Sequence, residues 1–148
     1  EQWLKRYQAW RYLVDPVFWG HEHVSASQPA LWVGNHSMMA FADASLMVSE
    51  LYQRHGIVLR SLAQHLHFKV PVWKKWLINN GAVDGTRENC QAMMAGQEHI
   101  LVYPGGGGEV MKRKGEQHQL RWKNRTGFAR GRIWVRLVRM DHCRSPHA

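Results

Sequence analysis

The sequence predicts an α/β domain with a mostly parallel central sheet flanked by helices, incomplete at its C-terminus. Short apolar runs that suit buried strands alternate along the chain with amphipathic stretches that suit helices. The 148 residues have the length of one ordinary domain, and 45% hydrophobic against 21% charged residues is a globular composition. We expect the domain to cover residues 1–130 and a poorly packed, atypical tail to cover residues 131–148.

Residues 1–19 form the first expected element. Apolar residues recur there at three- and four-residue spacings with basic residues between them, which predicts an amphipathic helix that breaks near Pro16. Such a helix most often covers the core of its own domain. A Trp-rich apolar face with flanking Lys and Arg also suits a bilayer interface. The two interpretations are compatible if the domain lies on a membrane.

Four short apolar runs predict the strands of the sheet. These runs are Ala30–Gly34, Ile57–Leu62, Gly81–Val83 and His99–Tyr103. A glycine run over 105–108 follows the last of them. If the chain lacks further strands beyond this point, the Ile100–Tyr103 strand is expected to become an exposed apolar edge.

Three helices are expected between and after these strands, at Asp43–Gly56, Pro71–Asn79 and Thr86–Gly96. Asp43 is a candidate N-cap of the first helix and Gly56 its C-terminal glycine. Proline opens the second helix, where its missing N–H costs least.

A histidine follows the first strand, in Val-Gly-Asn-His-Ser over 33–37, and a carboxylate comes next at Asp43. The carboxyl edge of an open α/β sheet is where ligands bind. His36 can act as a general base whose other ring nitrogen bonds Asp43. The pair can meet only if residues 37–42 form a loop that folds Asp43 back. The alternative is a loop histidine followed by a helix-capping aspartate.

Two further segments follow predicted strands. The run Val-Tyr-Pro-Gly-Gly-Gly-Gly-Glu over 102–109 can bring backbone N–H groups together without Cβ interference, or can serve as a flexible turn. It lacks the Gly-Lys-Ser/Thr ending of a phosphate-binding loop. Arg87, after Gly-Ala-Val-Asp-Gly-Thr, could hold a phosphate or carboxylate with its planar fork, or could be a solvated arginine at a helix start.

These segments occur in one order, and together they resemble the glycerolipid and lysophospholipid acyltransferase superfamily, in particular its branch similar to diacylglycerol acyltransferases. The resemblance runs from about Leu13 through Arg130. It rests on Gly-Asn-His-Ser with the later Asp, on Gly-Ala-Val-Asp-Gly-Thr-Arg-Glu-Asn-Cys, on Val-Tyr-Pro-Gly-Gly with Glu109, and on Lys-Arg-Lys-Gly through Arg-Thr-Gly-Phe-Ala.

The resemblance implies a glycerolipid acyltransferase-like fold and an enzyme that moves a fatty acyl group to a hydroxyl of a glycerolipid or lysophospholipid. The donor would be an acyl thioester of coenzyme A or acyl-carrier protein, with no metal or redox cofactor. It implies that His36 is the general base and Asp43 its orienting partner. It places Pro104, Gly105, Gly106 and Glu109 in the acceptor and oxyanion region, and Arg87 at the acceptor head group.

Three features depart from the superfamily pattern. Six residues separate His36 from Asp43, a longer spacing than the most widespread one and similar to the diacylglycerol acyltransferase-like branch. Gly108 stands where an arginine is expected before Glu109. Residues 131–148 do not resemble the strands and helices that continue the family domain, which indicates a C-terminally truncated or altered copy. A catalytically inactive, membrane-associated remnant is the alternative function.

The charge and the cysteines bear on partners and location. Lys and Arg number 20 against 11 Asp and Glu, so the net charge of +9 favours an anionic membrane surface and peripheral or monotopic association. A basic nucleic-acid-binding module around Lys112–Arg125 is a weaker alternative and nucleic acid is not expected, because no helix-turn-helix, RRM or zinc pattern accompanies the cluster.

Only Cys90 and Cys143 are present, which favours an intracellular protein without structural disulfides.

Two histidines invite a metal hypothesis. His65 and His67, two residues apart, are expected on one face of a strand. No third ligand completes a recognisable local pattern such as HExxH, so no metal site is predicted.

Overall fold

The computed structural model describes residues 8, 11–12, 15–35, 40–111, 113–116, 119–122, 125 and 127, with the side chains of 40–43 outside that description. The expected helix over 1–19 falls largely outside these residues; of its members, Gln8, Arg11 and Tyr12 are helical. The expected tail over 131–148 lies wholly outside them. No helix in the described part of the chain is both long and apolar enough to cross a membrane.

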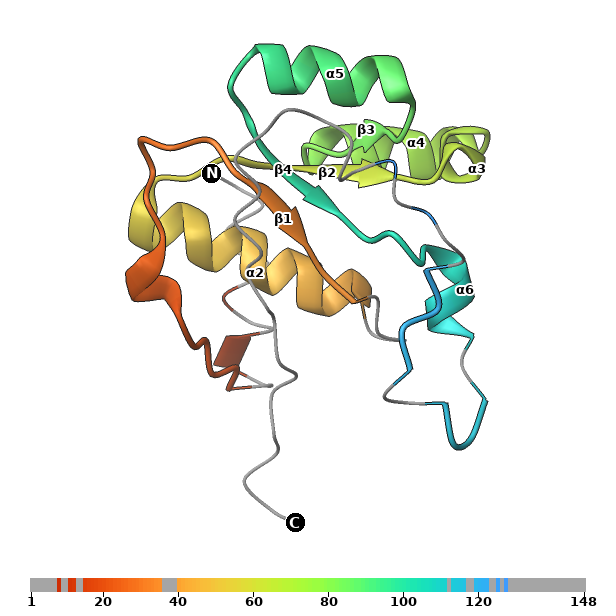
Figure 1. Ribbon diagram of the computed structural model, residues 1–148, viewed down its shortest axis with the longest axis horizontal. Coiled ribbons are helices and arrows are strands. Elements are labelled where there is room, and N and C mark those ends of the chain that lie inside the picture. The colour runs from red at the N-terminus through yellow and green to blue at the C-terminus, as the bar shows by residue number, and fades with distance from the viewer. Residues whose placement is uncertain are drawn as a thin grey trace.

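Four parallel strands form the central sheet, which confirms the predicted α/β class. They are β1 (Leu31–Val33), β2 (Leu59–Ala63), β3 (Val83–Asp84) and β4 (His99–Val102). Their order is β1-β4-β2-β3, and every pairing is parallel. The arrows of β1, β2 and β4 in Figure 1 therefore lead toward the same side of the molecule.

Six helical elements accompany the sheet in the described residues. They are the 3-10 turn η1 (His21–His23), α2 (Ala40–His55), α3 (His65–Phe68), α4 (Pro71–Asn79), α5 (Arg87–Ala95) and α6 (Gly107–Val110). Pro71 begins α4 as predicted. Thr86 caps α5, because its side-chain oxygen accepts the N–H of Asn89 at 3.2 Å.

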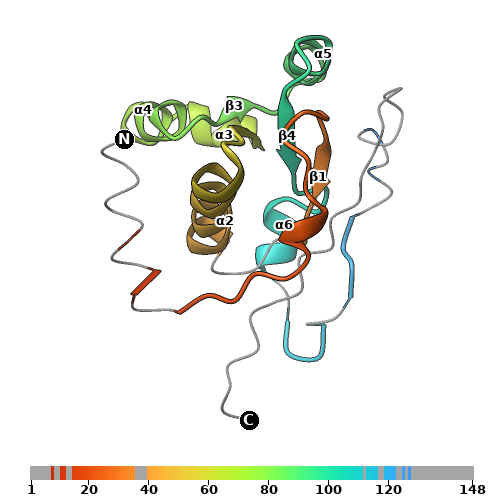
Figure 2. The ribbon, with the colours of Figure 1, turned by 90° about the vertical axis from the view of Figure 1, so that its left-hand side faces the viewer.

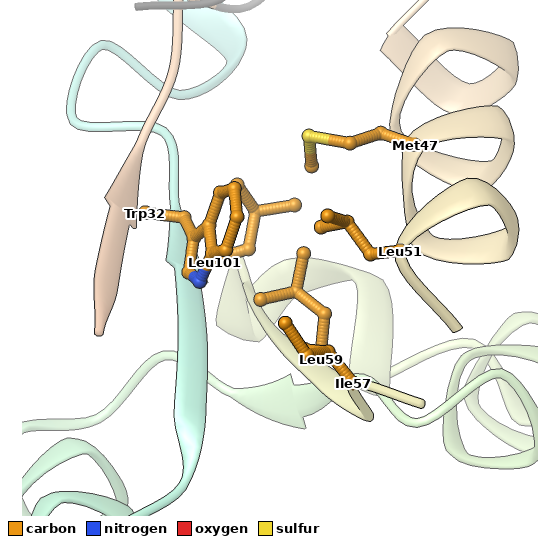
Figure 3. Close-up of a cluster of buried hydrophobic side chains, with 6 residues drawn as sticks. All are labelled: Trp32, Met47, Leu51, Ile57, Leu59 and Leu101. Atoms are coloured by element: carbon orange, nitrogen blue, oxygen red, sulfur yellow. The ribbon is translucent and has the colours of Figure 1, made fainter. Parts of the chain in front are cut away.

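Alternation along the strands divides the core between the two faces of the sheet. Helix α2 covers one face, where it contributes to a cluster of Trp32, Met47, Leu51, Ile57, Leu59 and Leu101 (Figures 2 and 3). Helix α5 covers the other face, where Met93 packs with Leu31, Val33 and Ile100. Neighbouring residues of one strand, such as Leu31 and Trp32, thus join opposite clusters, as the period of two requires.

Strand β4 is one of the two interior strands among the four described, and its residues lie at the centre of this core. It pairs with β1 on one side and with β2 on the other. Leu101 is 0% exposed as a result. The expectation that the Ile100–Tyr103 strand becomes an exposed edge is therefore wrong, because the sheet order covers both of its sides.

Two local expectations also need correction. His65 and His67 lie in the short helix α3 and not on a strand, because β2 ends at Ala63. Asp43 is not an N-cap, since α2 begins at Ala40 and includes Asp43. The Ala-Phe-Ala stretch before Asp43 contains two of the strongest helix formers, which favours this earlier start.

Helix α2 carries a buried charge that ties it to the N-terminal segment. Glu50 is buried, and its carboxylate accepts hydrogen bonds from the guanidinium groups of Arg11 and Arg54. Phe18, from the same segment, packs against the cluster beneath α2. The helix ends at His55, and Gly56 follows it as the predicted C-terminal glycine, with φ of 67° and its N–H donated to the Tyr52 carbonyl at 2.9 Å.

Candidate active site at the carboxyl edge of the sheet

The candidate site lies where the four parallel strands end. The chain leaves β1 at Gly34, β2 at Gln64, β3 at Gly85 and β4 at Tyr103. Backbone bonds extend the sheet by one residue at two of these ends: Gly34 N–H donates to Val102 at 3.1 Å, and Gly85 N–H to Ala63 at 2.8 Å. The predicted site segments after β1, β3 and β4 are therefore brought to one edge.

The expected catalytic pair straddles the β1–α2 connection. His36 lies outside the described residues, and Asp43 is described by its backbone alone. Asp43 lies in the first turns of α2, and residues 40–42 precede it in the same helix, so the loop expected over 37–42 is wrong for residues 40–42. Residues 37–39 lie outside the described residues. The pairing of the two side chains stays a prediction, with Asp43 on a helix that starts at the carboxyl edge of β1 (Figure 1).

The glycine run forms a turn that leads into a short helix. Gly106 N–H donates to the Tyr103 carbonyl at 3.0 Å, and Glu109 N–H donates to the Gly106 carbonyl at 3.0 Å. Gly106 has φ of 53°, a left-handed conformation that favours glycine. The N–H of Gly106 is thus engaged within the turn in this conformation.

Glu109 is buried against this turn and links it to the basic segment that follows. One carboxylate oxygen accepts the Arg121 backbone N–H at 2.7 Å. A Cβ on Gly105 would lie 1.9 Å from Glu109 Cγ, so only glycine fits there. Arg125 donates to the Pro104 carbonyl at 3.4 Å. The structure therefore brings Pro104, Gly105, Gly106 and Glu109 together, with Glu109 in a position that holds the turn.

Arg87 lies at the same edge of the sheet but on the β3 side. It is exposed and is the first residue of α5, directly after the Thr86 cap. Strand β2 lies between β3 and β4, so Arg87 and the glycine turn follow strands that are not neighbours. Its guanidinium is free to be approached from solvent, as a head-group ligand would require.

Sequence reasoning missed Gln64 and His65, which follow β2, and Asp84, the last residue of β3. His65 Nδ1 lies 2.6 Å from Asp84 Oδ2, which forms a histidine–carboxylate pair at this edge. A Cβ on Gly107 would lie 3.6 Å from Gln64 Oε1, so Gln64 reaches the glycine turn. One sequence signal could have found these residues: each comes directly after, or soon after, a predicted strand.

Within the described ranges, no group of three His, Cys, Asp or Glu could hold a metal ion.

Cys90 belongs to the motif that begins at Gly81, and its thiol is partly buried within α5. Burial raises the pKa of the Cys90 thiol, and its sulfur lies 3.8 Å from Met94 Sδ within α5. A raised pKa leaves little thiolate near neutral pH, and the thiolate is the reactive form. Its contact with Met94 makes Cys90 a packing residue of α5.

One surface hollow among the described residues lies away from this edge. It measures about 370 Å³ and is lined by residues at the amino ends of β2 and β4, among them Val58, Arg60 and His99. Ligands of parallel α/β sheets bind at the carboxyl ends of the strands. We therefore place the candidate site at the edge where the carboxyl ends of the strands meet, and not in this hollow.

Comparison with known proteins gives the family. The model of the diacylglycerol acyltransferase family matches residues 1–136. The chain is 32% identical over 117 residues to phytyl ester synthase 2, chloroplastic, of Arabidopsis thaliana, with 74% of this chain covered. It is 28% identical over 110 residues to the DGAT1/2-independent enzyme synthesizing storage lipids of Bos taurus, again over 74% of this chain. No solved structure matched it. The chain belongs to the diacylglycerol acyltransferase family.

The chain spans only part of these relatives. The matched region covers 16% of the plant protein and 32% of the bovine one. The family model's match over residues 1–136 includes the described residues and the segments at the ends of β1, β3 and β4.

Proposed function

We propose that this chain transfers a fatty acyl group from an acyl thioester to a hydroxyl of a glycerolipid or lysophospholipid. The observation that carries the proposal is the family match over residues 1–136. The names of both relatives support it, because one refers to a phytyl ester and the other to storage lipids. Acyl-CoA or an acyl-carrier protein would supply the thioester.

In the proposed reaction His36 removes the proton of the acceptor hydroxyl as its oxygen attacks the thioester carbonyl. The new C–O bond forms, the C–S bond breaks, and the imidazolium returns the proton to the leaving thiolate. Asp43 orients the imidazole and stabilises the imidazolium. The proposed step needs no redox cofactor, since no electron leaves the reactants, and its proton transfers are assigned to His36 without a metal.

The other site residues are proposed to bind and orient the substrates. Pro104, Gly105 and Gly106 would line the acceptor and oxyanion region, and the buried Glu109 would keep that turn in place through its bond to the Arg121 N–H. Arg87 is exposed at the same sheet edge, where its planar fork would bind a phosphate or carboxylate of the acceptor head group.

We also propose that the chain works at a membrane surface as a peripheral or monotopic protein. The Trp-rich face of residues 1–19 and the Lys and Arg residues after Met111 would face anionic lipid. A bilayer would present both the lipid alcohol and the acyl chain to the site.

The test is acyl transfer by the full chain and its histidine variants. His36→Ala should lower the rate by about 10²–10⁴-fold, because the general base is lost. Asp43→Asn should lower it severely while circular dichroism and the melting temperature stay native. His23→Ala is the matched control, since this exposed histidine lies in η1. Near-native transfer by His36→Ala, or a full chain that consumes no thioester in the presence of a lipid alcohol, would contradict the proposal.

A further inference from the structure

A basic segment lies against the glycine turn that follows β4. We call residues 119–125 the flanking segment, and all of them except residues 123 and 124 are described. Trp122 packs against the core cluster on the face of the sheet that α5 covers. The backbone N–H of Arg121 donates to the carboxylate of Glu109 at 2.7 Å. These two contacts fix the flanking segment just before Arg125.

Arg125 places its guanidinium on the glycine turn itself. Its backbone N–H donates to the Trp122 carbonyl at 2.8 Å, and its Nη1 donates to the Pro104 carbonyl at 3.4 Å. A Cβ on Gly106 would lie 3.2 Å from the same Nη1 atom. The guanidinium therefore lies beside the backbone of the turn, on the side of Gly106 that a side chain would occupy.

The guanidinium of Arg125 keeps most of its hydrogen-bonding capacity for a ligand. An arginine side chain has five N–H donors. Within the described part of the chain, the side chain of Arg125 makes one hydrogen bond, to Pro104, and no ion pair. The described arginines that do pair with a carboxylate are Arg11, Arg54, Arg60 and Arg121. Arg125 is thus a cation at the turn whose charge no described carboxylate neutralises.

The turn itself has few backbone donors to spare at this point. Backbone N–H groups often stabilise the oxyanion of an acyl-transfer reaction. In this turn Gly106 N–H already donates to the Tyr103 carbonyl, and Glu109 N–H already donates to the Gly106 carbonyl. The guanidinium beside Gly106 supplies free donors where these two N–H groups are engaged.

The turn adjoins the segment that contains the proposed general base. Strands β1 and β4 are neighbours, and Gly34 N–H donates to the Val102 carbonyl at 3.1 Å. His36 and Pro104 each follow this bonded pair by two residues. Two residues of chain span at most about 7 Å. Both segments therefore leave the sheet at the same place.

We propose that Arg125 is a catalytic residue that donates hydrogen bonds to the carbonyl oxygen of the acyl thioester. As the acceptor oxygen bonds to the carbonyl carbon, the C=O electron pair moves onto the carbonyl oxygen, and the guanidinium stabilises that charge. The electron pair re-forms the C=O bond as the C–S bond breaks, and the guanidinium keeps all of its protons. The inference rests on the proposed function, and it adds the group that polarises the carbonyl.

The first test is the steady-state kinetics of acyl transfer by the full chain with Arg125→Met. We expect kcat to fall by about 10²-fold, as for the loss of one oxyanion donor. The KM for the thioester should change far less, because this hydrogen bond strengthens only as the charge develops. Lys74→Met is the matched control, since it also removes one exposed cation, from α4. Equal kcat values for the two variants would overturn the proposal.

A conservative variant separates stabilisation of the substrate from a structural role of the Pro104 contact. Arg125→Lys keeps the charge and an N–H donor but loses the planar fork. Its kcat should therefore lie between those of the unmodified chain and Arg125→Met, while the melting temperatures of both variants stay native. A lysine variant that is no faster than the methionine variant would overturn the role of Arg125 as a donor.

Infrared difference spectroscopy reads the same hydrogen bond without turnover. The probe is octanoyl-CoA, isotope-labelled at the thioester carbonyl carbon, added to the His36→Ala chain so that the thioester stays intact. Donation by Arg125 should move the carbonyl band of the bound probe to lower frequency. Adding Arg125→Met should abolish this shift, and adding Lys74→Met should keep it. Absence of the shift in the chain that retains Arg125, or a shift that survives Arg125→Met, would overturn the proposal.

The kinetic and spectroscopic measurements distinguish failure of this inference from failure of the proposed function. Undiminished transfer by Arg125→Met would overturn the inference and leave the proposed function in place. An unmodified chain that transfers no acyl group would overturn the proposed function. A carbonyl shift that depends on Arg125 would still support the assignment of Arg125 in that case.

Discussion

Helices α2 and α4 are both rich in apolar residues, and both lie next to the same sheet, yet they use those residues differently. In α2, Leu46, Met47 and Leu51 are buried against the sheet. In α4 no residue is buried, and Val72 and Ile78 lie exposed. The difference shows that the apolar residues of a helix do not by themselves reveal whether they are buried against the protein's own core.

The position of each helix relative to the sheet explains why α2 is buried and α4 is not. Helix α2 crosses the face formed by the long interior pairings of β4 with β1 and β2 (Figure 2). Helix α4 precedes β3, a two-residue strand at the sheet margin that pairs with β2 alone among the described strands. So short a strand offers little surface to cover the apolar side chains of α4.

The sharpest test of this comparison is truncation of one apolar residue on each helix. Leu51→Ala should lower the free energy of unfolding by about 2–5 kcal/mol, because Leu51 is 5% exposed and its removal leaves a cavity. Val72→Ala should change it by less than about 0.5 kcal/mol. Urea denaturation followed by circular dichroism gives both values. A Val72→Ala loss as large as that of Leu51→Ala would mean that α4 is a core helix.

The charged residues of the two helices provide a second, smaller contrast. Glu50→Gln should lower the free energy of unfolding by about 1–3 kcal/mol, since a neutral amide replaces the buried acceptor of two guanidinium groups. The loss is limited because Arg11 and Arg54 are partly exposed and can turn to water. Lys74→Gln should leave the urea midpoint unchanged. Coincident midpoints for both variants would remove the contrast.

The fold was predictable where local sequence signals decide the structure. Pro71 and Asn79 bound α4 as expected, and Thr86 and Gly56 act at helix ends as expected. Steric and hydrogen-bonding rules for proline, threonine and glycine act within a few residues, so the sequence carries them directly. The class of the sheet followed from the alternation of these elements.

The arrangement of the sheet and part of the site were not predictable in this way. The interior position of β4 depends on pairings between residues far apart in sequence, such as Leu31 with Ile100. His65 lies in a four-residue helix, too short for its apolar pattern to distinguish a helical period from a strand period. The bond from Arg121 to Glu109 joins residues across an irregular segment that no periodic pattern describes.

The smallest prediction concerns a feature that the two helices share. Gly56 follows α2 with φ of 67°, and Gly81 follows α4 with φ of 78°. Alanine at either position should lower the free energy of unfolding by about 1 kcal/mol, because a left-handed backbone strains a residue with a Cβ. Steric crowding adds little: a Cβ at Gly56 meets nothing within 4 Å, and at Gly81 it meets only the Leu59 carbonyl oxygen at 4.0 Å.

Equal costs for Gly56→Ala and Gly81→Ala in urea denaturation would show that the end of α4 is held as firmly as the end of α2. Gly81 N–H donates to the Ile78 carbonyl at 3.0 Å and Ala82 N–H to the Leu77 carbonyl at 2.9 Å, so backbone bonds hold this turn. A negligible cost for Gly81→Ala alone would mean that the turn after α4 relaxes freely and holds its helix end less firmly than the turn after α2.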